Sequence, residues 1–314
     1  DLHSFPTRRS SDLNLSEDSA VDLYCDFLLS TVDYRLDGMK VVLDCANGAS
    51  YIAAPHVYRS LGAEVTVIGD RPDGVNINDN IGSTHPGKLQ AKVLETGADI
   101  GLAFDGDADR LIVVDEKGEI IDGDKAICLC AATLRKEGRL YKGRVTATVM
   151  SNIGFHKYIT EKLGGCVDVT AVGDRYVLES MLKTGSVIGG EQSGHIIFRD
   201  YTTTGDGTLS SLQFIKALLG SGRKASELSA EVELFPQVLV NAKVKNESKA
   251  VFMEDPEVKQ AISKAEAELN GDGRVLIRPS GTEPLARVMI EGKDAAQIKT
   301  MAEEIAGLIS RKYM

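Results

Sequence analysis

The sequence predicts an α/β fold with two similar mixed-sheet α/β domains, followed by a small α+β domain at the carboxyl end. Between residues 37 and 234, short runs rich in valine and isoleucine alternate with amphipathic segments, which is the pattern of βαβ units. The order of these segments and of their polar loops repeats weakly from residue 139. After residue 235 this alternation stops, which indicates a third domain of a different kind.

The composition is that of a globular protein with no strongly charged macromolecular partner. The chain has 314 residues, of which 43% are apolar and 26% are charged, and its net charge is −10. An excess of negative charge argues against binding to nucleic acid or to a membrane surface. The five cysteines are odd in number and include no CxxC pair, which favours a reducing compartment. We therefore expect a cytoplasmic protein whose anionic substrate would need a local cationic pocket.

The domain boundaries follow from these changes of pattern. Residues 1–13 have neither periodicity nor an apolar signal region, and are expected to be a non-native or disordered tail. A helix-like segment occupies residues 14–36. We expect a first α/β domain at 37–138, a second at 139–234 and the α+β domain at 235–314.

The first α/β domain should alternate strands with helices. Apolar runs predict strands at 39–45, 64–69, 99–104, 110–115 and 118–122. Apolar residues that recur on one helical face predict helices at 51–63, 86–98 and 124–138. The fourth and fifth strands lie close enough in sequence to form a hairpin.

The second α/β domain should repeat this order. The predicted strands are at 143–150, 166–172, 186–190 and 195–198, and the predicted helices are at 151–165, 173–185 and 208–222. In the first domain a strand runs into the loop DGDAD, and DGD at 122–124 begins a helix. In the second a strand meets GEQSGH and GDG at 205–207 opens a helix. Both polar loops should therefore lie at the carboxyl ends of strands, where open α/β sheets bind ligands.

The carboxyl-terminal domain combines three predicted strands with two long helices. One strand is expected at 238–244, and a helix at 255–271 begins with an aspartate cap followed by proline. Residues 274–292 read as two strands that flank a loop, and residues 294–313 as a closing helix.

The first candidate site is the acidic loop at the end of the buried strand 99–104. Asp105, Asp107 and Asp109 alternate along it, and like charges this close repel one another. Hard oxygen ligands suit Mg²⁺ or Ca²⁺. An EF-hand does not fit, because Arg110 occupies the position that needs glycine and strands flank the loop. The alternatives that remain are a cation site and a solvated acidic turn.

The second candidate is GGEQSGH at 189–195. Glu191, Ser193 and His195 alternate along an extended segment and should project to one side. A carboxylate and a hydroxyl can hydrogen-bond the hydroxyls of a sugar, and an imidazole can move a proton. A glycine-rich hairpin with a solvated polar face is the alternative.

The third candidate is RPSGTEP at 278–284. Arg278 offers a charged fork, Ser280 and Thr282 offer hydroxyls, and Gly281 allows backbone N–H groups to approach a phosphate. Arg287 could add a second positive charge. An ordinary Ser-Gly-Thr turn is the alternative reading.

The fourth candidate is VGDRYV at 172–177. Gly173, Asp174 and Arg175 lie where a strand should pass into a helix, and a helix amino terminus and an arginine both favour an anion. A simple capped turn is the alternative. A cation loop, a sugar-hydroxyl loop and a phosphate cradle on successive domains together indicate phosphosugar chemistry.

These motifs resemble those of the α-D-phosphohexomutases over roughly residues 14–314. DGDADR resembles the magnesium loop of that superfamily, GEQSGH its sugar loop and RPSGTEP its phosphate loop. Gln192 and Gly281 are similar to residues of the phosphoglucosamine mutase branch, whereas the phosphomannomutases and phosphoglucomutases more often carry Met and Asn there.

The resemblance implies an isomerase of carbohydrate metabolism. A phosphoserine would pass its phosphoryl group to the sugar through a bisphosphate intermediate, interconverting glucosamine 6-phosphate and glucosamine 1-phosphate for UDP-N-acetylglucosamine synthesis. Mg²⁺ would be held by Asp105, Asp107, Asp109 and the phosphoserine. Arg110 would help to hold the phosphate and His195 would carry a proton. The partner would be a phosphorylated amino sugar, and a homodimer is left open.

One feature of the superfamily has no counterpart in this sequence. Its nucleophilic serine lies in a TASHNP-like loop of a first domain, and only the segment 14–36 resembles the end of that domain. GSTHPG at 82–87 is superficially similar to the serine loop. It precedes a helix of the first α/β domain, which contains the magnesium loop, so Ser83 is not expected to be the nucleophile. We therefore expect a fragment that keeps the metal, sugar and phosphate sites but lacks the serine that carries the phosphoryl group. The alternatives are a phosphomannomutase or phosphoglucomutase, and a non-catalytic phosphosugar-binding module.

Overall fold

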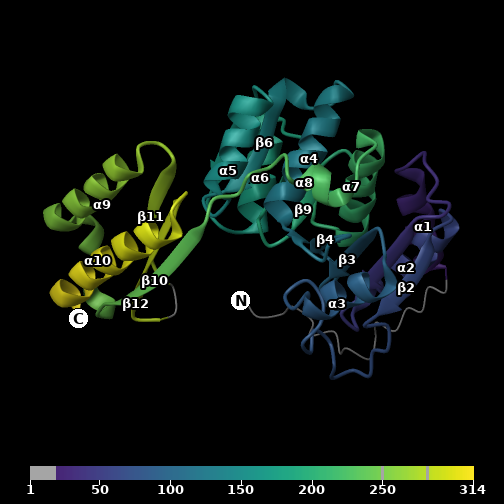
Figure 1. Cartoon of the computed structure of the whole chain (residues 1–314), viewed down its shortest axis with the longest axis horizontal. Coiled ribbons are helices and arrows are strands. Elements are labelled where there is room, and N and C mark those ends of the chain that lie inside the picture. The colour runs from purple at the N-terminus through teal and green to yellow at the C-terminus, as the bar shows by residue number, and fades with distance from the viewer. Residues whose placement is uncertain (1–18, 249–250, 281–282) are drawn as a thin grey trace, which may run out of the picture. The chain divides into compact units, whose positions relative to one another are not determined.

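The structure is a computed structural model that describes residues 19–248, 251–280 and 283–314 (Figure 1). The expected tail at 1–13 lies outside the described residues. The chain divides into two compact units. Of the described residues, unit 1 comprises those up to Ile120 together with Asp206–Lys216, and unit 2 comprises those of Ile121–Gly205 and Ala217–Met314.

Unit 1 is built on a five-stranded sheet. Its strands are β1 (Lys40–Asp44), β2 (Glu64–Ile68), β3 (Ile100–Phe104), β4 (Leu111–Asp115) and β5 (Ile120–Ile121), in the order β2-β1-β3-β4-β5, and β5 ends one residue beyond the unit. The strands β1, β2 and β3 are parallel, and β4 returns antiparallel to β3. The sheet is therefore mixed, as expected.

The helices of unit 1 cover both faces of this sheet. They are α1 (Ala20–Ser30), α2 (Ala53–Ser60) and α3 (Gly87–Thr96), with a 3-10 turn at Ala49–Tyr51 and the start of α7 (Gly207–Ser221). A Cβ at Gly101 of β3 would meet Leu89 and Val93 of α3, and a Cβ at Gly207 of α7 would meet Phe104. Residues 101 and 104 point to opposite faces of the strand, so α3 and α7 lie on opposite sides. All five residues of β3 are consequently buried.

Unit 2 contains a second sheet, of the order β7-β6-β8-β9. Its strands are β6 (Arg144–Thr148), β7 (Cys166–Thr170), β8 (Ile188–Gly190) and β9 (Ile196–Phe198), with β9 antiparallel to β8. A Cβ at Gly189 would meet Met181 of α6, and a Cβ at Gly190 would meet Ile127 of α4. Neighbouring strand residues point to opposite faces, so this sheet is also covered on both sides.

The helices of this part are α4 (Gly123–Lys136), α5 (Ile153–Lys157), α6 (Asp174–Thr184), the end of α7 and α8 (Ala225–Ser229), with a 3-10 turn at Tyr141–Gly143. The expected helix at 151–165 is divided, because α5 passes into a π-helix at Tyr158–Lys162. The helix α4, expected in a first α/β domain that ends at residue 138, falls within unit 2.

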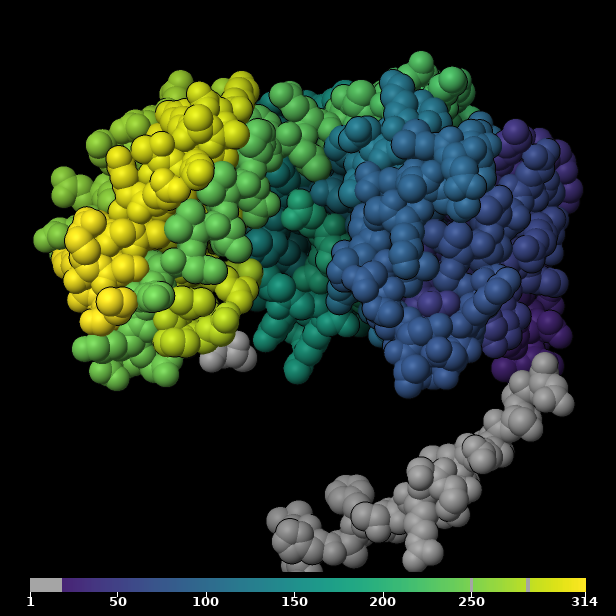
Figure 2. All heavy atoms as spheres, turned by 60° about the horizontal axis from the view of Figure 1, so that its bottom comes forward, coloured from purple at the N-terminus to yellow at the C-terminus, as the bar shows by residue number. Residues whose placement is uncertain are grey.

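The carboxyl-terminal part of unit 2 has an antiparallel sheet of the order β10-β12-β11. Its elements are β10 (Gln237–Lys243), α9 (Pro256–Leu269), β11 (Gly273–Pro279), β12 (Leu285–Gly292) and α10 (Ala295–Tyr313), with 3-10 turns at Asn246–Ser248 and Phe252–Glu254. Its own core includes Phe252, Val288 and Ile298. These elements, green to yellow in Figure 2, form the expected α+β domain. No described helix could cross a lipid bilayer.

Candidate functional site

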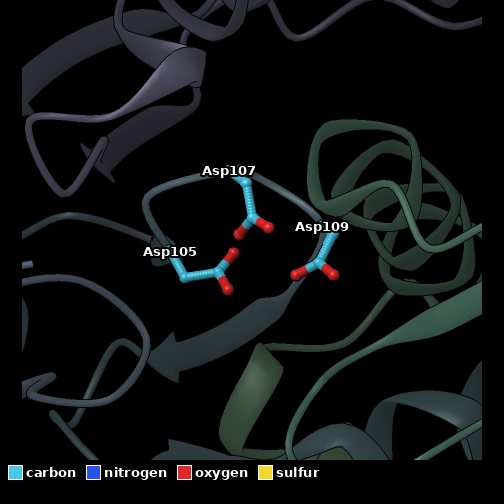
Figure 3. A group of neighbouring side chains, drawn as sticks. All are labelled: Asp105, Asp107 and Asp109. Atoms are coloured by element: carbon cyan, nitrogen blue, oxygen red, sulfur yellow. The ribbon is translucent and has the colours of Figure 1, made fainter. Parts of the chain in front are cut away.

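The three aspartates of the acidic loop converge, as the sequence predicts. Figure 3 shows that the side chains of Asp105, Asp107 and Asp109 turn toward one another, and one carboxylate oxygen of each lies within 4.8 Å of the others. Asp105 is buried, Asp109 is half-buried and Asp107 is exposed. Three hard oxygen donors at this separation can coordinate one Mg²⁺. Their chemistry and convergence therefore fit the expected cation.

Arg110 balances part of the charge of the loop. Burial raises the pKa of the Asp105 carboxyl, and the nearby Asp109 carboxylate raises it further. Arg110 opposes this effect, since its backbone N–H donates to Asp105 Oδ1 at 3.1 Å. Its guanidinium Nε lies 3.5 Å from Asp105 and 3.7 Å from Asp109, and the side chain is 41% exposed. Arg110 thus lies beside the carboxylates and remains accessible to a phosphate.

Close backbone contacts hold the acidic loop in place. Ala49 N donates to Gly106 O at 2.8 Å, and Gly207 N donates to Ala108 O at 2.8 Å. A Cβ at Gly207 would collide with the carbonyl oxygen of Arg110. Ala108 has φ +61°, a left-handed conformation that costs a residue other than glycine about 1–2 kcal/mol. The sharp turn that brings the aspartates together is therefore supported from outside the loop.

The sugar loop and the turn at 172–177 meet. Glu191 Oε1 accepts a hydrogen bond of 3.0 Å from Gly173 N, so the two sequence-predicted segments are neighbours. Asp174 and Arg175 are exposed at the start of α6, and Arg175 pairs with Glu179 at 2.9 Å. An exposed arginine at this helix terminus can reach an anion. One carboxylate oxygen of Glu191, Oε1, holds the turn.

Ser193 and His195 have different environments. Ser193 is exposed at the tip of the loop, whereas His195 is 4% exposed. The Nε2 atom of His195 accepts a hydrogen bond of 2.9 Å from Gly205 N. This bond requires an unprotonated Nε2, so His195 stabilises the backbone in this state. Its role as a proton carrier remains a prediction.

The amino terminus of α4 packs under the sugar loop. Gly123 N donates to Gln192 O at 3.0 Å, and a Cβ at Gly123 would collide with the carbonyl oxygen of Glu191. Asp122 caps α4 through Lys125 N and also accepts from Gln192 Nε2 at 3.1 Å. The Gln192 side chain is thus bonded to protein. From the sequence, DGD at 122–124 indicates only the start of a helix, although its glycine also permits a close approach of another backbone segment.

The phosphate loop presents two arginines side by side. Arg278 of β11 lies directly opposite Arg287 of β12, and like charges in this position repel. Arg287 Nη2 donates to Glu283 at 3.3 Å, whereas Arg278 makes no hydrogen bond or ion pair within the described residues. Ser280 is buried, its N–H donates to Leu285 O at 2.8 Å and its Oγ accepts from Glu283 N at 3.2 Å. An anion beside the arginines would relieve their repulsion. Gly281 and Thr282 lie outside the described residues.

Ser83 of GSTHPG lacks the accessibility of a nucleophile. It is 8% exposed, and its hydroxyl is buried without a hydrogen-bond partner within the described residues. Its backbone N–H donates to Phe104 O at 2.8 Å, beside the acidic loop. The position supports the loop. That Ser83 does not attack the substrate stays a prediction.

Comparison with known proteins identifies the family. Three family models match: Phosphoglucomutase/phosphomannomutase, alpha/beta/alpha domain II over residues 22–118, alpha/beta/alpha domain III over 122–235, and the C-terminal domain over 239–308. The domain III match begins at residue 122, so it includes α4, in agreement with the contacts of that helix.

Curated relatives are similar over nearly the whole chain. A phosphoglucosamine mutase of Thermoanaerobacter sp. (strain X514) is 58% identical over 289 residues, which are 92% of this chain and 64% of the relative. The chain thus spans less than two thirds of that relative. A phosphoglucosamine mutase of Clostridioides difficile (strain 630) is 54% identical over 312 residues, or 99% of this chain and 69% of the relative.

Solved structures share the fold. A phosphoglucomutase/phosphomannomutase family protein from Burkholderia thailandensis has a TM-score of 0.71 at 24% identity, over 91% of this chain and 64% of that one. The N-acetylphosphoglucosamine mutase of Aspergillus fumigatus, solved in complex with GlcNAc-6P and magnesium, has a TM-score of 0.72 at 20% identity, over 94% and 65%. The three family models and the identity to curated relatives show that this chain belongs to the phosphoglucosamine mutase family of the α-D-phosphohexomutases.

Proposed function

We propose that this chain supplies the metal, sugar and phosphate sites of an enzyme that interconverts glucosamine 6-phosphate and glucosamine 1-phosphate. The observation that supports it most directly is the convergence of Asp105, Asp107 and Asp109 on one point. The family and the arginine pair of the phosphate loop support the phosphorylated sugar as the ligand.

In this proposal each part of the chain has a separate task. The three aspartates hold Mg²⁺, which when bound neutralises negative charge on the transferred phosphoryl group. Arg110, beside the carboxylates, binds the phosphoryl oxygens. Ser193 and Glu191 hydrogen-bond the sugar hydroxyls. Glu191 does so through Oε2, the carboxylate oxygen that does not accept from Gly173 N. Arg175 with Asp174 and Gly173 borders the sugar site, and His195 carries a proton.

The phosphate loop would bind the phosphate that does not react. Arg278, Ser280 and Arg287 supply charge and a hydrogen-bond donor to it, together with Gly281 and Thr282. An oriented substrate places its reacting hydroxyl without the entropic cost of free encounter. The phosphoserine and the bisphosphate intermediate are proposed by family, and the phosphoserine is proposed to come from outside the described residues. The chain alone should therefore bind substrate without turnover.

Calorimetry of the purified chain with glucosamine 6-phosphate and Mg²⁺ tests the binding part. We expect saturable binding that weakens strongly in Asp107→Asn if the metal bridges chain and phosphate, and tighter binding of glucosamine 6-phosphate than of glucose 6-phosphate or mannose 6-phosphate. A preference for either of the latter would favour a phosphoglucomutase or phosphomannomutase.

Incubation with glucosamine 1,6-bisphosphate, followed by mass spectrometry of the chain, tests the catalytic part. We expect no phosphorylated chain and no interconversion of the monophosphates. Turnover by the purified chain would show that no outside phosphoserine is needed. If the natural full-length protein also lacks turnover while binding persists, a phosphosugar-binding module is the better description.

A further inference from the structure

The amino terminus of α7 is hydrogen-bonded to the acidic loop at Ala108, the residue of the loop with a left-handed backbone conformation. Gly207 N donates to Ala108 O at 2.8 Å, and Ala108 lies between two of the proposed metal ligands, Asp107 and Asp109. Because Ala108 has φ +61°, its conformation must be maintained by its surroundings. A shift of Gly207 would release this carbonyl and change the direction of the neighbouring carboxylates.

The residue before Gly207 is fixed by a tyrosine from a distant part of the sequence. Asp206 caps α7, because its Oδ1 accepts a hydrogen bond of 2.8 Å from Leu209 N. The hydroxyl of Tyr24, on α1, lies 3.0 Å and 2.9 Å from the two carboxylate oxygens of Asp206. Hydrogen bonds to a charged acceptor are about twice as strong as neutral ones. Burial, followed by the Asp206 charge, raises the pKa of Tyr24, so its hydroxyl stays protonated and can donate.

We propose that Tyr24 is a positioning residue for the metal loop. By holding Asp206, it fixes the start of α7 and therefore the Ala108 carbonyl between Asp107 and Asp109. This inference rests on the proposed function, since it presupposes that the three carboxylates bind a divalent cation. It assigns α1, which carries none of the recognised motifs, a role in the affinity for the metal.

Two other tyrosines provide matched controls. Tyr34 OH donates to Leu212 O at 2.8 Å, and Tyr58 OH donates to Ser211 Oγ at 2.7 Å, both farther along α7. Replacing any of the three by phenylalanine removes the bonding of its hydroxyl to this helix and leaves the ring in place. Only the bond of Tyr24 is made at the residue adjacent to the contact with the acidic loop. A merely structural role would make the three variants alike.

The test is the dissociation constant of Mn²⁺, measured by calorimetry on the whole chain at constant pH and salt. We expect Tyr24→Phe to weaken binding about tenfold, as is typical for residues that orient metal ligands, and Tyr34→Phe and Tyr58→Phe to change it less than about twofold. Asp206→Asn keeps a helix cap but loses the charged acceptor, so it should weaken binding by a smaller factor. If circular dichroism shows that Tyr24→Phe does not fold, Asp206→Asn tests the proposal in its place.

The outcomes separate this inference from the metal site itself. If the wild-type chain binds Mn²⁺, Asp107→Asn abolishes binding, and Tyr24→Phe and Asp206→Asn bind as the wild type does, the role of Tyr24 is overturned. Equal weakening in all three tyrosine variants overturns it as well, because the effect is then one of general stability. A wild-type chain that does not bind Mn²⁺ overturns the proposed metal site, and the role of Tyr24 with it.

Discussion

Removing the cationic partner of a buried carboxylate should destabilise the carboxyl-terminal sheet. Arg274 of β11 lies opposite Glu291 of β12, with Nε 2.6 Å from Oε2 and Nη2 3.3 Å from Oε1. The Glu291 side chain is fully buried, whereas that of Arg274 is 24% exposed. Arg274→Met retains much of the apolar stem but removes the positive charge that Arg274 places beside the Glu291 carboxylate. The same change removes the bond of 2.6 Å from Arg274 to Ser151 O.

The expected loss follows from what remains around the carboxylate. Removing one partner of a buried ion pair costs about 3–5 kcal/mol. Ile153 N still donates to Glu291 Oε2 at 3.0 Å, and solvent reaches Arg274, so we expect the lower end, about 3 kcal/mol. In contrast, the pair of Lys299 and Glu303 joins side chains that are 66% and 58% exposed across 4.0 Å. Lys299→Met should therefore cost less than about 0.5 kcal/mol.

Hydrogen–deuterium exchange of the β12 backbone is the suitable assay, because it reports the local free energy of opening in a chain of several domains. A loss of about 3 kcal/mol corresponds to exchange more than about a hundredfold faster in Arg274→Met, with little change in Lys299→Met. The double variant with Glu291→Gln should recover part of the loss, because the buried side chain at position 291 then carries no charge. Equal exchange rates in Arg274→Met and the wild type would refute the reasoning.

Three further changes test the charge and packing of the sites. Burial, followed by the charge of the nearby Asp122, raises the pKa of Asp124 to about 8. Between about pH 4 and pH 8 the folded state therefore retains a proton that the unfolded state has lost. The stability of the folded state is highest at low pH in this respect, and it decreases as the pH rises to about 8. The melting temperature of Asp124→Asn, measured relative to the wild type, should therefore rise between pH 5 and 8, and a constant difference contradicts the assignment. Gly123→Ala should weaken the binding of glucosamine 6-phosphate, measured by calorimetry, about tenfold, because the new methyl group displaces the sugar loop. Gly220→Ala is the control, since its methyl group would meet no atom within 4 Å. Equal affinities of the two variants would count against the contact between Gly123 and the sugar loop. Arg278→Met should weaken the same binding about tenfold and reduce its dependence on salt, and an unchanged salt dependence would place the phosphate elsewhere.

The prediction of the fold was accurate where local pattern decides structure. The strand at 99–104 and the hairpin that follows it were confirmed as β3, β4 and β5, because alternation and turn residues act within a few positions. The partner sheet of the helix at 124–138 was not predictable in this way. An amphipathic pattern shows that one face is buried, but not against which sheet, and Gly123 instead packs on the sugar loop of unit 2. The π-helix at Tyr158–Lys162 likewise had no recognised signal.

The sequence by itself determined the family, the strands and helices, and the places of the three loops, because these depend on residue types at short spacing. Only the tertiary structure decided how the loops are held. The contacts of Gly207 with Ala108, of Tyr24 with Asp206 and of Arg278 with Arg287 join different elements. The first two depend on packing between elements that are far apart in the chain, and the third depends on the register of a hairpin. No local periodicity encodes which of these residues will meet.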